Sequence, residues 1–199
     1  MEDLFLDKRE VLRYLGYRKK QALTPEISQL IDEEMLEIKE VAKARYTYQV
    51  YDIEPDYATR AIKVLDTTLV LSGENAFSRL YQAEKVALFA GTLGIEVDRR
   101  LAMYARSDVT RGLILDACAV EYIEKVMDVA ERKAVERFEG WRVNRRFSPG
   151  YGDLPLAIQG EFLAACRAER VLGIQLTSAH LMIPRKSVTA FVGLFNPND

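Results

Sequence analysis

Apolar residues recur every three or four positions along much of the chain, which is the spacing of amphipathic helices. Asp7 with Glu10 suggests a capping box, Thr24-Pro25 a second helix start, and Asp108 a third. Helices are expected over residues 7–16, 24–42, 74–81, 95–104, 108–138 and 156–171, the last closed by Gly173.

Between these helices lie segments with strand-like patterns. Residues 46–53 are rich in aromatic and β-branched side chains, and a slip in their alternation between Val50 and Tyr51 indicates a bulge. A second strand is expected over 64–71. The unbroken apolar run 85–90 is typical of a strand covered on both faces, and residues 187–194 predict a terminal strand.

The order of these elements predicts the fold class. Helices and strands are mixed without regular βαβ alternation, which favours an α+β fold with an antiparallel sheet over a doubly wound parallel one. Neither an internal repeat nor a low-complexity segment interrupts the sequence. We therefore expect a single domain over residues 1–199.

Composition narrows the function. The 199 residues are 49% hydrophobic, and 28 basic and 30 acidic side chains are interspersed for a net charge of −2, so nucleic acid is not an expected partner. No apolar window of ~18 residues occurs, and acids replace the basic start of a signal peptide, so a cytoplasmic protein without a membrane span is expected. Cys118 and Cys166 lie in apolar helical patterns and are expected to be buried thiols. A single histidine, His180, argues against a self-contained metal site.

The most chemically specific stretch is residues 145–153, RRFSPGYGD, hereafter the site loop. Pro149-Gly150 suits the centre of a β-turn that brings Ser148 and Tyr151 together. The fork of Arg146 matches a carboxylate or phosphate, and Tyr151 offers a ring for stacking. These residues predict a pocket for a small zwitterionic or anionic ligand with a flat ring. The alternative is that Arg146 pairs with a neighbouring acid and Tyr151 fills a gap in the core.

Two further groups are candidates for the same site. Residues 176–187 combine hydroxyls, His180 and two cations in one turn. The alternative is that this turn is a hydroxyl-capped connection whose basic side chains face solvent. Asp116, Glu121 and Glu124 on the long predicted helix are within reach of a bound cation, but acids on helices usually face water.

These motifs resemble a known family. Residues 146–151 followed by a helix and then by Leu176-Thr177-x-Ser-x-x-Met-x-Pro-x-x-Ser-Val resemble the activation domain of cobalamin-dependent methionine synthase. The resemblance is clearest over residues 85–199, whereas residues 1–84 resemble small stand-alone relatives of that domain. The sequence departs from the family's pattern at Phe147, Gly152-Asp153, Ala179 and His180.

The resemblance implies a C-shaped α+β domain with a central antiparallel sheet, which binds S-adenosylmethionine for reductive remethylation of cobalamin. Its cofactor-binding residues would be Arg146 at the carboxylate, Ser148 and Gly150 at the adenine turn, Tyr151 facing the corrin, and Asp116 and Glu121 as the acidic pair. The cobalamin would be held by a partner chain, because the cobalt-ligating and zinc-thiolate motifs are absent from this sequence.

The expected function is thus that of an accessory subunit, not a complete enzyme, for a methionine synthase or related corrinoid methyltransferase. A flavodoxin-type electron donor is a further candidate partner. One alternative is a non-catalytic protein that caps a corrinoid module and has lost S-adenosylmethionine binding. Another is a small-molecule sensor unrelated to cobalamin.

Overall fold

The centre of the fold is a six-stranded antiparallel sheet with the order β3-β2-β1-β4-β8-β5. A computed structural model describes residues 4–18 and 21–197. The strands of the large sheet are β1 (Arg45–Asp56), β2 (Ala61–Val64), β3 (Val70–Ser72), β4 (Lys85–Thr92), β5 (Arg142–Val143) and β8 (Ser187–Phe195). A separate two-stranded sheet is formed by β6 (Gln175–Leu176) and β7 (Met182–Ile183).

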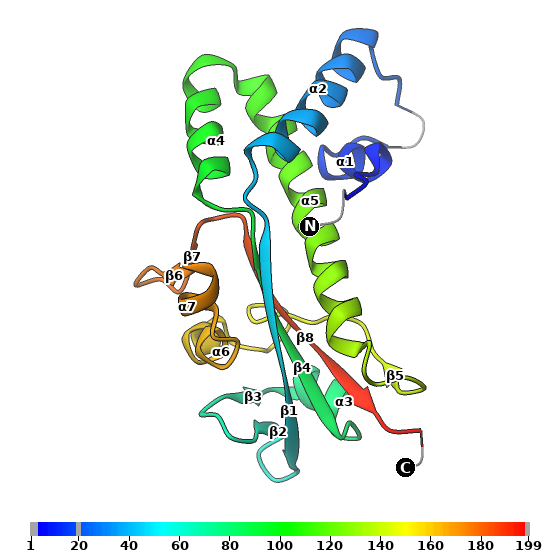
Figure 1. Ribbon diagram of the computed structural model, residues 1–199, viewed down its shortest axis with the longest axis vertical. Helices are drawn as coiled ribbons and strands as arrows, with labels where there is room; N and C mark the ends of the chain where they lie inside the picture. The colour runs from blue at the N-terminus through cyan, green and yellow to red at the C-terminus, as the bar shows by residue number, and fades with distance from the viewer. Residues whose placement is uncertain (1–3, 19–20, 198–199) are drawn as a thin grey trace.

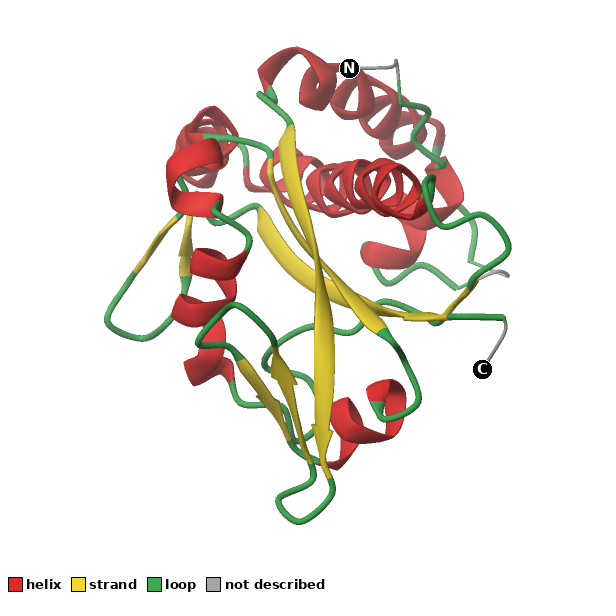
Figure 2. Ribbon diagram, turned by 60° about the horizontal axis from the view of Figure 1, so that its bottom comes forward, coloured by secondary structure: helices red, strands yellow, loops and turns green. Residues whose placement is uncertain are grey.

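Helices cover both faces of the sheet and build a bundle at one end (Figures 1 and 2). They are α1 (Lys8–Tyr14), α2 (Pro25–Val41), α3 (Glu74–Leu80), α4 (Ile95–Ser107), α5 (Val109–Val135), the 3-10 helix η1 (Leu156–Ile158), α6 (Gln159–Ala165) and α7 (Ala168–Leu172). The long helix α5 joins the helical bundle to the sheet, because its first part packs with α1, α2 and α4 and its second part lies on the sheet. Among the described residues, no helix is both long and apolar enough to cross a bilayer.

Strand β4 explains why both faces of the sheet are covered. Its side chains alternate between two apolar clusters, with Val86 and Leu88 facing α3, α6 and α7, and with Ala87 and Phe89 facing α5. At Gly91 the helix comes so close that a Cβ atom would lie 2.7 Å from the sulfur of Met127. The prediction of a strand covered on both faces is thereby confirmed.

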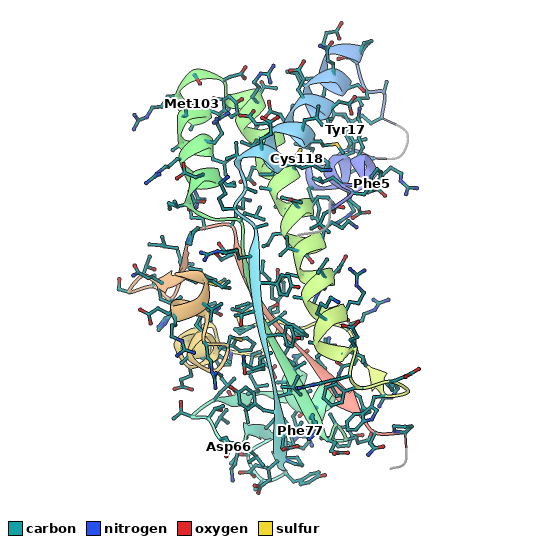
Figure 3. The ribbon with its side chains drawn as sticks, in the orientation of Figure 1. Phe5, Tyr17, Asp66, Phe77, Met103 and Cys118 are labelled. Carbon is teal, nitrogen blue, oxygen red and sulfur yellow. The ribbon has the colours of Figure 1, made fainter. Side chains whose placement is uncertain are left out.

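The bundle end has its own apolar core, in which Cys118 is fully buried between α5 and its neighbours (Figure 3). The fully buried Glu34 on α2 accepts a hydrogen bond of 2.6 Å from Arg111 on α5. Cys166 is buried in the core on the sheet face opposite α5, and both thiols are free as predicted. Burial raises the pKa of the Cys118 thiol to about 12.

The predicted fold class is confirmed, and several predicted termini are also found. Thr24 and Asp108 cap α2 and α5 through hydrogen bonds from the amides of Ile27 and Arg111. Gly173 closes α7 in the left-handed conformation with φ of 72°. The capping box at α1 is only half formed, since Asp7 accepts from the amide of Arg9 but the Asp7 amide donates to Glu121 instead of Glu10.

Three local predictions are wrong. Residues 64–71 are not one strand, because Asp66 turns the chain at φ of 61° and Thr67 bonds Val64 across the turn between β2 and β3. The pairing of β1 with β4 is continuous from Arg45 to Asp52 without a bulge. The helix expected over 156–171 is three pieces, since Arg167 adopts φ of 56° between α6 and α7.

Candidate functional site

The site loop forms one wall of a pocket whose opposite wall is strand β8. The cavity has a volume of about 400 Å³, within the range of small-molecule sites. Its lining combines the site loop with residues from α5, the start of α6, β7 and β8, namely Glu124, Arg146, Phe147, Ser148, Pro149, Tyr151, Leu156, Gln159, Met182, Ser187, Val188, Thr189 and Ala190.

The turn at the centre of the loop has the predicted geometry. The amide of Tyr151 donates to the carbonyl of Ser148 at 3.3 Å, and Gly150 has φ of 87°, a conformation that costs glycine little. The side chain of Tyr151 is 68% exposed at the mouth of the pocket. Ser148 and Tyr151 therefore line the pocket, while Gly150 supplies the bend between them.

Two anchors hold the loop at its ends, and both use residues at which the sequence departs from the family's motif. Phe147 exchanges backbone hydrogen bonds of 3.0 and 2.8 Å with Phe191 of β8. Asp153 caps α3 by accepting from the amides of Glu74 at 2.7 Å and Asn75 at 3.0 Å. The hydrogen bonds from Asn75 and Glu74 lower the pKa of Asp153 despite a small opposing effect of burial. The unusual residues thus have structural roles.

Arg146 lies between the pocket and a row of acids on α5. Its guanidinium donates to Asp128 at 2.7 Å, to Glu124 at 3.1 Å and to Glu131 at 3.1 Å. One positive and three negative formal charges give this cluster a net charge of −2. This arrangement also matches the alternative expectation that Arg146 pairs with neighbouring acids.

The electrostatics of the cluster follow from its partial burial. Burial alone lowers the pKa of Arg146, but the hydrogen bond to Asp128 and the charges of Asp128, Glu131 and Glu124 raise it overall. Burial raises the pKa of Glu131, and Arg146 opposes that rise. Arg146 therefore stays charged, and its charge favours the ionised form of Glu131.

The two other predicted site residues lie elsewhere. Asp116 forms an ion pair of 2.8 Å with Lys186 and does not line the pocket. Glu121 is buried where α5 meets α1, and it pairs with Lys125 and the amide of Asp7. The acid that does reach the pocket is Glu124, which lies farther along α5 toward the site loop.

The second sequence motif meets the first at this pocket. Met182, Ser187 and Val188 line it, whereas His180 is exposed in the turn between β6 and β7 and does not. Gln159 and Thr189 belong to the lining but were not predicted. A signal for each exists, because Gln159 is a polar residue on an apolar helical face and Thr189 follows Ser187 at strand spacing.

The fold and the site together define an α+β domain with a pocket of small-molecule size between the site loop and β8. No protein-family model matches the sequence, and no curated protein matches it. A solved structure does match, described as the crystal structure of the MetH reactivation domain bound to AdoHcy. The similarity has a TM-score of 0.71 at 14% sequence identity and covers 98% of this chain and 75% of the other.

This chain therefore has the fold of the MetH reactivation domain. The resemblance that the sequence motifs indicate is confirmed at the level of the fold, including the central antiparallel sheet flanked by helices.

Proposed function

We propose that this chain binds S-adenosylmethionine in the pocket between the site loop and β8. In this role it serves as an accessory subunit in the reductive reactivation of a cobalamin-dependent methionine synthase or a related corrinoid methyltransferase. The observation that carries the proposal is the convergence of two motifs, separated by a helical segment in the sequence, on one pocket. The similar solved structure, which holds AdoHcy, supports a ligand of this chemistry.

The charges at the pocket suit such a ligand. S-adenosylmethionine carries a sulfonium, an ammonium and a carboxylate, so its net charge is positive, and the cluster around Arg146 has a net formal charge of −2. Arg146 would hold the ligand's carboxylate through its planar fork. Glu124 lines the same wall and would face a positive group of the ligand. Bound there, the ligand supplies the methyl group for reactivation.

The mouth of the pocket suits presentation to another chain. Tyr151 is exposed beside the opening, and the nearby Leu181 and Ile183 of the β6–β7 hairpin are also exposed. In the proposed complex these side chains would face the corrinoid protein that holds the cobalamin. A flavodoxin-type electron donor would complete the reductive system.

Calorimetric titration tests the binding step. We expect the chain to bind S-adenosylmethionine and S-adenosylhomocysteine, and we expect Arg146→Ala to weaken both. Arg145→Ala is the matched control, because Arg145 is an exposed neighbour of the same type that lies outside the pocket. Absence of heat with the unchanged chain, or equal affinities in the two variants, would refute this assignment.

A second candidate function is that of a non-catalytic cap for a corrinoid module. The specific observation in its favour is that both terminal nitrogens of Arg146 already bond acids of α5, so that a ligand carboxylate spanning both nitrogens would have to displace an acid from Nη2. Reactivation separates the two candidates. The chain is mixed with reductant, S-adenosylmethionine and an oxidised methionine synthase that lacks its own reactivation domain. Restored methyl transfer supports the accessory subunit, and association without restored methyl transfer supports the non-catalytic cap.

A further inference from the structure

The site loop is fastened to the start of α3 by the carboxylate of Asp153. Its Oδ2 accepts from the amide of Glu74 at 2.7 Å. Its Oδ1 accepts from the amide of Asn75 at 3.0 Å and from the Nδ2 of the same residue at 2.9 Å. The N-cap position of α3 is occupied by Gly73, which offers no side chain to these first-turn amides. The loop therefore supplies the cap that the helix lacks locally.

Two glycines allow the loop and the helix to approach so closely. A Cβ atom on Gly73 would lie 2.8 Å from Oδ1 of Asp153, and a Cβ atom on Gly152 would lie 2.8 Å from Nδ2 of Asn75. Both glycines have a positive φ, of 105° and 56°, which glycine adopts at little cost. Each segment thus leaves room for the polar side chain of the other, so the junction is complementary from both sides.

The junction holds the turn that lines the pocket, because the loop is bonded to itself. The amide of Tyr151 donates to Ser148, the amide of Leu154 donates to Tyr151, and the amide of Gly150 donates back to Leu154 at 2.9 Å. Leu154 is 1% exposed within the core cluster that also contains residues of α3. Asp153 lies between this buried leucine and the turn, and it does not line the pocket itself. Whatever fixes Asp153 therefore also fixes Ser148 and Tyr151.

We infer that Asp153 is a positioning residue for the ligand, which holds the pocket wall in its binding shape before the ligand arrives. It acts through Ser148 and Tyr151. A wall that is ordered in advance spares the ligand the free energy of ordering it. If the wall adopts the binding shape only part of the time, the apparent Kd rises in inverse proportion to that fraction. The inference rests on the proposed function for the identity of the ligand.

The test combines hydrogen exchange with ligand titration. In the full chain without ligand, Asp153→Ala should make the amides of Gly150 and Leu154 exchange about tenfold faster, as expected when one capping side chain is lost. The Kd for S-adenosylhomocysteine should rise roughly fivefold to tenfold, and saturating ligand should restore slow exchange. The matched control is Asp108→Ala, which removes a carboxylate cap of the same kind from α5. It should lower stability without changing loop exchange or affinity.

A second variant loosens the junction while leaving every loop residue in place. Gly73→Ala puts a methyl group against Asp153 and should produce the same two changes. Its control is Gly16→Ala, which has a similar φ of 82° but open space around its Cβ atom. Thermal melting establishes that each variant is folded.

The outcomes separate this inference from the proposed function. Unchanged loop exchange or unchanged affinity in folded Asp153→Ala overturns the inference, as does an equal loss of affinity in Asp108→Ala. If the unchanged chain does not bind S-adenosylhomocysteine, the proposed function is refuted instead. The exchange rates of the ligand-free loop still decide in that case whether Asp153 orders the wall of the pocket.

Discussion

Replacing Arg146 by alanine should destabilise the protein through the acids that it leaves behind. Arg146 is the only described residue that bonds Glu124, Asp128 and Glu131 together, and these acids lie on one face of α5. Without the guanidinium, three negative charges remain beside a partly buried wall. The loss of stability therefore measures how much the cluster contributes to the fold, independently of any ligand.

The expected magnitude follows from the burial of each pair. The side chains of Arg146 and Glu131 are 21% and 29% exposed, so their charge-assisted hydrogen bond contributes about 1.5 kcal/mol. The carboxylates of Glu124 and Asp128 are more exposed, and each such pair contributes about 0.5 kcal/mol after screening by solvent. We expect Arg146→Ala to lower the free energy of unfolding by roughly 2–3 kcal/mol near neutral pH.

This loss should diminish in acid. Burial raises the pKa of Glu131, and Arg146 opposes the rise, so removing Arg146 raises the folded-state pKa further above the unfolded value. A carboxyl whose pKa is higher in the folded state penalises folding fully above that pKa, and the penalty disappears as the pH falls through it toward the unfolded value. The difference between the two proteins should therefore be larger at neutral pH than near pH ~4.5.

Urea denaturation at several pH values provides the measurement. Arg145→Ala is again the control, since an exposed substitution of this kind should change stability by less than about 0.5 kcal/mol. High salt should reduce the effect of Arg146→Ala but not abolish it, because the cluster is partly buried. Equal losses in the two variants, or a loss at Arg146 that does not change with pH, would show that the cluster does not stabilise the fold.

Three further outcomes are expected elsewhere in the fold. Asp153→Asn should lower the urea midpoint at neutral pH and have less effect in acid. The pKa of Asp153 is lower in the folded protein than in the unfolded chain, so its carboxylate stabilises the fold at any pH above the unfolded-state pKa. That contribution is lost as the pH falls through the folded-state pKa. Gly91→Ala should cost about 1–3 kcal/mol in thermal denaturation, because its Cβ would press on the sulfur of Met127; an unchanged melting temperature would contradict the close approach. Cys118 and Cys166 should resist a thiol reagent near pH ~8 until the chain unfolds, and fast labelling of the native protein would contradict their burial.

The parts of the fold that were predictable depend on local pattern. The run at 85–90 indicated a doubly covered strand because both of its faces are apolar, and the caps at Thr24 and Asp108 use only residues a few positions away. The strand expected over 64–71 failed because β-branched content does not reveal that Asp66 adopts a positive φ. The cap of α3 was beyond local pattern, since Asp153 comes from 79 positions away.

The same distinction holds at the pocket. The turn from Ser148 to Tyr151 was predictable because proline and glycine determine it locally. Glu124 was one of three candidate acids on this helix, but which of the three reaches the pocket was not predictable, because α5 has 27 residues and meets the bundle with one part and the sheet with another. Which carboxylate faces the loop depends on where the helix crosses the sheet, so Asp116 and Glu121 lie elsewhere and Glu124 lies at the pocket.

The ion cluster and the pocket share Arg146 and Glu124, which couples the stability of the fold to the chemistry of the proposed ligand. A ligand carboxylate that bonds both terminal nitrogens of Arg146 would have to displace Glu124 or Asp128 from Nη2, and the displaced acid would then lose its bond to Arg146 beside a partly buried wall. A simple carboxylate offers no compensation for that loss. In the proposed complex, a ligand that brings an ammonium or sulfonium with its carboxylate would replace the lost positive charge, so the cluster would favour zwitterionic amino-acid ligands over anions of similar size.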